Sequence, residues 1–157
     1  DDSPLPPVVE ECLIYLKTAV REEGLFRVSP PTSEKELLIG WWDDGYRVHM
    51  ENSPSPHLVS CLLKHFLSKL PEPIMTFSLF DDFMALQADS TDFLQKMEGL
   101  RGLLHKLPKH NRNVLREILG LLAKVHQNRQ FSKMDAKNLA TVFAPVLFRP
   151  PPACEGS

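Results

Sequence analysis

The sequence predicts an all-α domain, and three observations support this fold class. Apolar residues recur every three or four positions through most of the chain, as on the buried face of a helix. Most of the 14 prolines fall between these periodic segments, where a missing N–H group costs little. No alternation of apolar and polar residues is long enough to predict a β-sheet.

The first predicted helix begins at Pro6 or Pro7 and runs to Val20, since proline suits the first turn of a helix. A charged turn follows it. We interpret residues 24–31 as an ordered loop, because the Pro-Pro pair at its end disfavours helix on its N-terminal side and holds the backbone extended.

The second predicted helix begins at a capping Thr32 or Ser33 and stops at Gly45. A polar stretch at residues 52–56 separates it from the third. This third helix covers about residues 56–69, with an apolar stripe facing inward, and ends before a Pro-Glu-Pro turn.

Two shorter helical patterns come next. One covers residues 78–88, and Ser90 or Thr91 can cap the other, which runs to about Lys106.

Pro108 opens a long helix with apolar residues at helical spacing as far as Val125. Ser132 and Asp135 resemble a capping box that starts the last helix, and Pro145 is expected to close it.

Length and composition predict one domain. The chain has 157 residues, of which 43% are hydrophobic and 24% charged, so we expect a single domain over residues 1–157 with a core from about residue 5 to residue 148. A net charge of -2 offers no long-range attraction for nucleic acid or an anionic membrane.

Compartment and assembly follow from similar observations. No apolar run is long enough to cross a membrane, and the acidic start is unlike a signal peptide. Three widely spaced cysteines, Cys12, Cys61 and Cys154, suggest neither a disulfide framework nor a zinc ribbon. We therefore expect a cytoplasmic, monomeric domain.

The common self-sufficient catalytic motifs are missing from the sequence, including phosphate-binding loops and the nucleophile elbow. His57, Cys61 and His65 are four residues apart, a spacing that can place three metal ligands on one helix face. A packed thiol among apolar neighbours is the favoured interpretation of Cys61, so we expect no metal site.

A locally basic stretch lies between residues 101 and 116. It is interpreted as a solvated helix face, with a protein-contact surface as the alternative. Nucleic acid is the weakest candidate partner, because no aromatic residues interleave the charges.

Arg27 is the first candidate functional residue. It lies in the 24–31 loop between Phe26 and Val28, two apolar residues that could anchor the loop and present the arginine. By itself, an arginine in a loop is more often an ordinary surface charge.

Three ordered motifs combine with this loop. They are EGLFRVS at residues 23–29, LKHFLSKLPEP at 63–73 and NLATVFAP at 138–145. Together they closely resemble the RhoGAP family of GTPase-activating domains. The likeness extends from about Leu5 to Phe148, nearly the whole chain.

The resemblance implies an all-α RhoGAP-like bundle of about seven to nine helices. It also implies that Arg27 is an arginine finger, inserted in trans into the active site of a Rho- or Rac-type small GTPase. The domain would then be an activator without a nucleotide site, metal or cofactor of its own, because the GTPase holds GTP and Mg²⁺. Domains of this family are usually parts of longer proteins, whose other segments could recruit them to membranes or the cytoskeleton.

Two further residues match positions of the family. Lys64 matches a lysine that supports the finger loop and contacts the GTPase; the alternative is an ordinary helix-surface lysine. Asn138 matches an asparagine that stabilises the finger region by hydrogen bonds; the alternatives are a helix cap or a satisfied core amide.

Three departures bear on catalytic efficiency. Ser68 stands where the family usually has an arginine that braces the finger loop, Val146 where many members have an asparagine that contacts the GTPase, and Pro30 where glycine is common. The alternative function is therefore a RhoGAP-fold binding module that docks a GTPase or another signalling protein without stimulating hydrolysis.

Residues Arg149–Pro152 form a short polyproline segment. It offers a weak candidate contact for an SH3 or WW domain.

Overall fold

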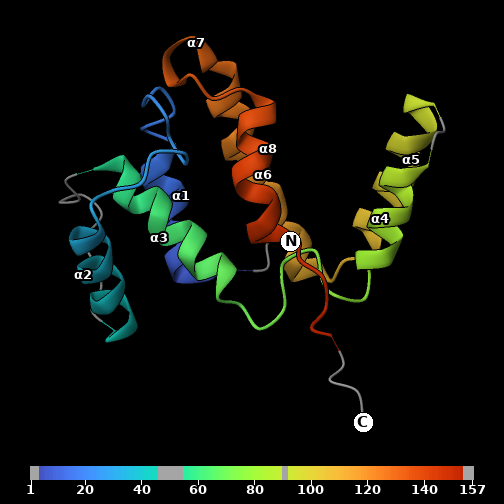
Figure 1. Cartoon of the computed structure of the whole chain (residues 1–157), viewed down its shortest axis with the longest axis horizontal. Helices are drawn as coiled ribbons and strands as arrows, with labels where there is room; N and C mark the ends of the chain where they lie inside the picture. The colour runs from blue at the N-terminus through green and yellow to red at the C-terminus, as the bar shows by residue number, and fades with distance from the viewer. Residues whose placement is uncertain (1–3, 46–54, 90–91, 154–157) are drawn as a thin grey trace.

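The computed structural model of the chain describes residues 4–45, 55–89 and 92–153. Within these ranges it contains eight helices and no strand, which confirms the all-α fold class (Figure 1). The helices are α1 (Pro7–Leu16), α2 (Thr32–Asp43), α3 (Pro56–Ser68), α4 (Phe80–Ala88), α5 (Phe93–Lys106), α6 (Lys109–Gln127), α7 (Arg129–Ser132) and α8 (Ala136–Leu147).

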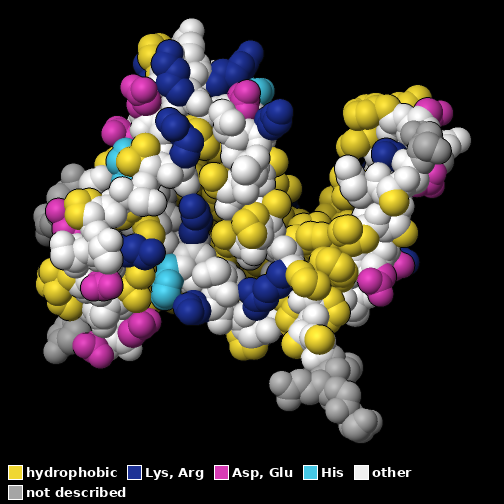
Figure 2. Space-filling model, viewed as in Figure 1, with side chains coloured by type: hydrophobic (Ala, Val, Ile, Leu, Met, Phe, Trp, Pro, Cys, Tyr) yellow, Lys and Arg dark blue, Asp and Glu magenta, His cyan; other side chains and the backbone are white. Residues whose placement is uncertain are grey.

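Helices α1, α3, α6 and α8 pack into a bundle around one apolar core. Helix α2 covers the outer side of α3, and α4 and α5 form an antiparallel arm on the far side of the bundle (Figure 1). Apolar side chains cover much of the arm's surface towards the bundle (Figure 2). Because α3 and α8 both belong to the bundle, their packing fixes the positions of the candidate residues Lys64 and Asn138.

Several predicted boundaries are confirmed. Helix α3 starts after Ser55, whose Oγ accepts a hydrogen bond from the N–H of His57 at 3.2 Å. The left-handed φ of Gly45, +81°, agrees with its predicted role after α2. Helix α6 buries the predicted stripe that ends at Val125. These boundaries depend on local chemistry, which the sequence displays directly.

The prediction for the end of the first helix is wrong. Helix α1 ends at Leu16, four residues before Val20. Tighter turns replace the helix there, closed by hydrogen bonds between residues three positions apart. One of these bonds runs from the N–H of Ala19 to the carbonyl of Leu16 at 3.0 Å. The Thr18 hydroxyl also donates to the Tyr15 carbonyl at 2.6 Å, competing with helix continuation.

Helix caps differ from the prediction at two helices. Pro31, not Thr32 or Ser33, is the N-cap of α2 and makes no side-chain cap bond. Asp135 alone caps α8, through a hydrogen bond from the N–H of Asn138 to its Oδ1 at 2.8 Å. Ser132 instead ends α7, a short helix that periodicity could not predict.

The N-cap of α5 is Asp92, whose Oδ1 accepts the N–H of Gln95 at 2.9 Å. The predicted caps Ser90 and Thr91 lie outside the described residues.

Pro145 does not close the last helix. It lies inside α8, which continues to Leu147. Proline removes only its own N–H group, and the next turn is still closed by the N–H of Phe148, which donates to the carbonyl of Ala144 at 2.9 Å.

Among the helices described, none is both long enough and apolar enough to cross a membrane.

Candidate functional site

The loop that carries Arg27 has an unusual backbone. Gly24 and Phe26 have φ angles of +70° and +72°, in the left-handed region. A Cβ atom on Gly24 would lie 2.5 Å from Cγ2 of Val28, so only glycine fits there. The N–H groups of Arg27 and Val28 both donate to the Gly24 carbonyl at 2.9 Å. The loop is therefore tightly folded around Gly24.

Two consecutive buried residues anchor the loop. Leu25 and Phe26 are 0% and 1% exposed, and the Phe26 ring meets the Phe143 ring edge-on at a centroid distance of 4.8 Å. Val28, predicted as the second anchor, is 43% exposed and does not anchor the loop from within the core. Arg27 follows Phe26 directly and is exposed. Burial of the two residues that precede Arg27 therefore holds its side chain at the surface.

Lys64 joins helix α3 to this loop. Its Nζ donates a hydrogen bond to the carbonyl of Phe26 at 2.9 Å, across 38 positions of sequence. Burial lowers the pKa of Lys64 below its ordinary value, and the charge of Lys35 lowers it further against the opposing effect of Cys61. Lys64 thus differs from an ordinary surface lysine, because it is half-buried and its hydrogen bond braces the loop.

Asn138 lies in the first turn of α8 with its side chain exposed. Its backbone N–H donates to the Asp135 cap, whereas its side-chain amide makes no hydrogen bond within the part of the chain that the structure describes. It is therefore not a core amide. The structure brings Arg27 and Lys64 together through Phe26 but does not join Asn138 to them.

The departures from the family pattern have different surroundings. Ser68 is exposed near the end of α3, and its hydroxyl donates to the carbonyl of His65 at 2.8 Å. Val146 is 7% exposed and belongs to the core. Pro30 leads into Pro31, the N-cap of α2, so the loop passes into this helix almost immediately.

Ser132 takes part in the site, although the sequence predicts it only as a cap. Its carbonyl accepts the N–H of Gly24 at 2.7 Å. No local signal could have revealed this bond, because the two residues are far apart in the chain. It attaches the Arg27 loop to the corner between α7 and α8.

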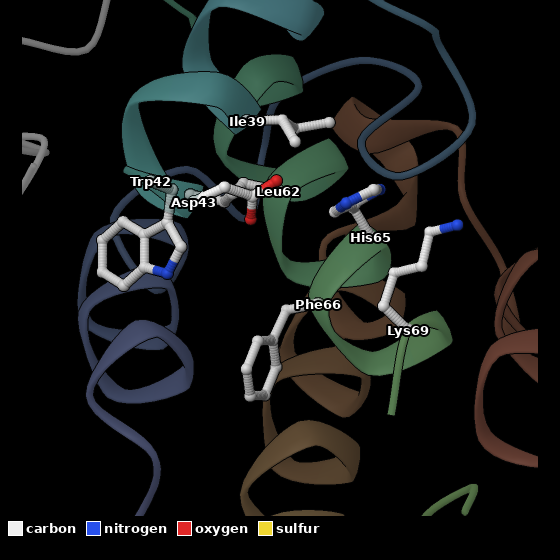
Figure 3. A pocket seen from close by; sticks show the side chains of 7 residues that line it. All are labelled: Ile39, Trp42, Asp43, Leu62, His65, Phe66 and Lys69. Carbon is white, nitrogen blue, oxygen red and sulfur yellow. The ribbon is translucent and has the colours of Figure 1, made fainter. Parts of the chain in front are cut away.

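A pocket of about 390 Å³ opens between α2 and α3 (Figure 3). Apolar side chains line it together with His65, Lys69 and Asp43. Burial lowers the pKa of His65 below its ordinary value, Lys69 and Lys35 lower it further, and Asp43 opposes the shift. Lys and Arg side chains are also prominent over α3 and beside it (Figure 2).

The lowered pKa of His65 predicts acid sensitivity. The folded protein disfavours the protonated form of His65. The free energy of unfolding therefore decreases as the pH falls from about 6.5, the ordinary pKa of histidine, through the lower pKa that His65 has in the folded state. We expect His65→Gln to lose less stability than the wild type between about pH 7.5 and about pH 5 in urea unfolding. His105→Gln, at an exposed histidine, is the matched control; equal losses in wild type and His65→Gln would contradict the prediction.

The three residues with metal-ligand spacing have different surroundings. His57 Nε2 lies 3.6 Å from Glu22 Oε1, and Cys61 is half-buried. No group of three potential ligands close enough to hold a metal ion is found in the part of the chain that the structure describes.

The Cys12 thiol is packed in the core, and burial raises its pKa to about 12. The basic stretch is largely exposed on α5 and α6, which fits both a solvated face and a protein-contact surface.

The polyproline segment begins with Arg149, whose guanidinium is hydrogen-bonded within the domain. Arg149 donates one hydrogen bond to the carbonyl of Ser68 at 2.9 Å and another to the carbonyl of Leu70. Pro150, Pro151 and Pro152 are exposed.

The fold and the site together define an all-helical domain that presents an arginine from a loop braced by buried side chains and by a lysine. A sequence model of the RhoGAP domain matches residues 6–152. The chain belongs to the RhoGAP domain family.

Curated relatives and solved structures agree with this assignment. The chain is 34% identical over 146 residues to Rho GTPase-activating protein gacY of Dictyostelium discoideum and 35% identical over 144 residues to human Rho GTPase-activating protein 44. These alignments cover 92% and 90% of the chain, but only 20% and 17% of the relatives. The chain thus spans about a fifth of each relative's length.

Two solved structures share the fold. The crystal structure of human Rho GTPase activating protein 15 matches with a TM-score of 0.86 and 26% identity, over 92% of this chain and 70% of that one. The BH domain from GRAF, the GTPase regulator associated with focal adhesion kinase, matches with a TM-score of 0.78 and 25% identity, over 96% of this chain and 85% of that one.

Proposed function

We propose that this domain binds a GTP-loaded Rho-family small GTPase, of Rho or Rac type, and accelerates GTP hydrolysis by inserting Arg27 in trans. The observation that carries the proposal is the exposed Arg27 side chain on a loop fixed by buried Leu25 and Phe26. Membership of the RhoGAP family and the names of the relatives, which are Rho GTPase-activating proteins, support the choice of partner.

Arginine suits this role for a physical reason. Transfer of the γ-phosphoryl group to water develops charge on the bridging and γ-phosphoryl oxygens, and a guanidinium offers a permanent positive charge with fixed hydrogen-bond donors. In Ras-type GTPases and Gα proteins such an arginine is worth about 10³ to 10⁵ in rate, or roughly 4 to 7 kcal/mol. A loop that is already ordered reduces the entropy lost when the arginine enters the active site.

On this proposal the domain acts as a monomer and supplies one side chain to a reaction centre that belongs to its partner. The GTPase holds GTP and Mg²⁺, and its own glutamine positions the attacking water. The domain needs no nucleotide, metal or cofactor of its own.

A binding module without activating power is the second candidate. Val146 favours it, because a buried valine offers no polar contact to a partner at a position where many family members have asparagine. Ser68 favours it too, since a short serine replaces the bracing arginine. The exposed Arg27 and its brace Lys64 oppose it.

Single-turnover hydrolysis measured beside a binding assay separates the two candidates. A panel of GTP-loaded Rho- and Rac-type proteins is mixed with the domain, and both the rate and the affinity are recorded. Acceleration of at least one member supports the activator. Binding with no acceleration across the panel supports the module, and neither binding nor acceleration contradicts both.

Lys64→Met is expected to lower the maximal rate of hydrolysis by about ten- to a hundredfold, because a hydrogen bond from a charged donor is worth about 1.5–3 kcal/mol. Methionine keeps the length of the side chain but cannot donate to the Phe26 carbonyl. The measurement is single-turnover hydrolysis at saturating domain. Lys69→Met is the matched control, since Lys69 is an exposed lysine directly after the end of α3; equal losses in both variants would refute the bracing role.

A further inference from the structure

The Arg27 loop has a second attachment, at the end of the bundle opposite the α3 C-terminus. We name residues 128–134, which contain α7 and lead towards α8, the α7 corner. The loop and the α7 corner lie side by side at one end of the bundle (Figure 1). The bond from the N–H of Gly24 to the carbonyl of Ser132, at 2.7 Å, joins them directly.

Arg21 makes two more contacts with this corner. Its guanidinium carbon lies 4.6 Å from the centre of the Phe131 ring, within the range of a cation–π interaction. Its Nε donates to Asn128 Oδ1 at 3.3 Å, across 107 positions of sequence. Both contacts hold the chain just before Gly24, whereas Lys64 holds the carbonyl of Phe26, just after it.

The α7 corner is itself well fixed. The Ser132 side chain is 0% exposed, and its hydroxyl donates to the Val125 carbonyl and accepts from the N–H of Met134, both at 3.2 Å. The Asn128 side chain also donates to the Lys124 carbonyl at 2.8 Å. Contacts with the corner therefore connect the loop to α6 through Asn128 and Ser132.

We propose that Arg21 and Phe131 are positioning residues, which hold the N-terminal side of the loop to the α7 corner so that Arg27 is presented in the orientation that hydrolysis requires. This inference rests on the proposed function. Neither residue needs to touch the GTPase. Without these contacts the segment from Arg21 to Gly24 is less restrained. The conformational entropy lost in ordering this segment then adds to the free-energy barrier of the step in which Arg27 enters the active site.

The kinetic test uses Arg21→Ala and Phe131→Ala. Each is expected to lower kcat for the GTP-loaded partner about fivefold, with KM unchanged, because the contacts are exposed and individually modest. Phe131→Tyr keeps the ring and should restore kcat. Phe93→Ala, at a 74% exposed phenylalanine on α5, is the control and should change neither constant.

A double substitution shows whether the corner acts through Arg27. In an Arg27→Ala background, Arg21→Ala should cause no further loss of kcat, since no finger remains to be positioned. A full additional fivefold loss in that background, or an equal rise of KM in the single variants, would overturn the proposal.

Hydrogen exchange of the free domain tests the attachment without the GTPase. Arg21→Ala and Phe131→Ala should speed exchange of the Gly24, Arg27 and Val28 amides, while the core amides of α3 keep their wild-type rates. Unchanged exchange at the loop overturns the attachment, and faster exchange with unchanged kcat in an active domain overturns its role in positioning. Failure of the wild type to accelerate hydrolysis would count against the proposed function alone, since exchange still decides the attachment.

Discussion

Arg27→Ala is expected to lower the single-turnover rate of GTP hydrolysis by a partner Rho-family GTPase by about 10³-fold or more at saturating domain. The truncated side chain leaves no positive charge to meet the charge that develops on the phosphoryl oxygens. Affinity for the GTP-loaded partner should change little, because the finger acts mainly in the transition state. Arg27→Lys should recover only a small part of the rate, since lysine lacks the planar pair of donors.

The matched control for this variant is Arg101→Ala, which removes an exposed arginine from α5. It should leave both rate and affinity at wild-type values. If Arg27→Ala kept most of the acceleration, or lost binding and rate in equal measure, Arg27 would be a docking residue and not a finger.

Phe26→Ala is expected to lower the free energy of unfolding by about 3–5 kcal/mol, the usual cost of deleting a buried phenylalanine. The Phe26 side chain is 1% exposed and loses its edge-on contact with Phe143. The left-handed φ of +72° remains unfavourable for alanine, so the variant keeps the backbone strain and loses the packing that offsets it. Single domains are stable by about 5–15 kcal/mol, so this loss is large.

Urea unfolding followed by circular dichroism measures this loss, with Phe93→Ala as the matched control. Phe93 is 74% exposed, and its truncation should change the free energy of unfolding by no more than about 0.5 kcal/mol. Similar midpoints for the two variants would contradict the view that Phe26 anchors the Arg27 loop in the core.

Much of the fold follows from short-range patterns. The apolar stripe of α3 and its start near Pro56 are local features, so periodicity and turn chemistry predict them, although they do not single out the cap Ser55. The same holds for the loop that begins at Gly24, where the Pro-Pro pair and the apolar residues Phe26 and Val28 predict an ordered loop, although only Phe26 of the two is an anchor. Errors arise where two local signals compete, as at Thr18, whose hydroxyl bonds to the backbone and helps to end α1 early.

The candidate site could be predicted only in part. Family resemblance singles out Arg27 and Lys64, but the bond between Lys64 Nζ and the Phe26 carbonyl spans 38 positions and exists only after folding. The attachment of Gly24 to Ser132 is longer in range, and no periodicity encodes it. The burial of Val146 likewise depends on how α8 packs. Contacts of this kind depend on tertiary structure, which local propensity does not specify.

The central claim is that Arg27 stabilises the transition state of a reaction in a partner's active site. Affinity for a Rho-family GTPase loaded with GDP and aluminium fluoride, which mimics the phosphoryl group in transfer, tests this claim most directly. The wild-type domain should bind this form at least about a hundredfold more tightly than the form loaded with a non-hydrolysable GTP analogue, and Arg27→Ala should lose that gain while keeping its affinity for the analogue form. A gain that survives in Arg27→Ala, or its absence from the wild type, would contradict the claim.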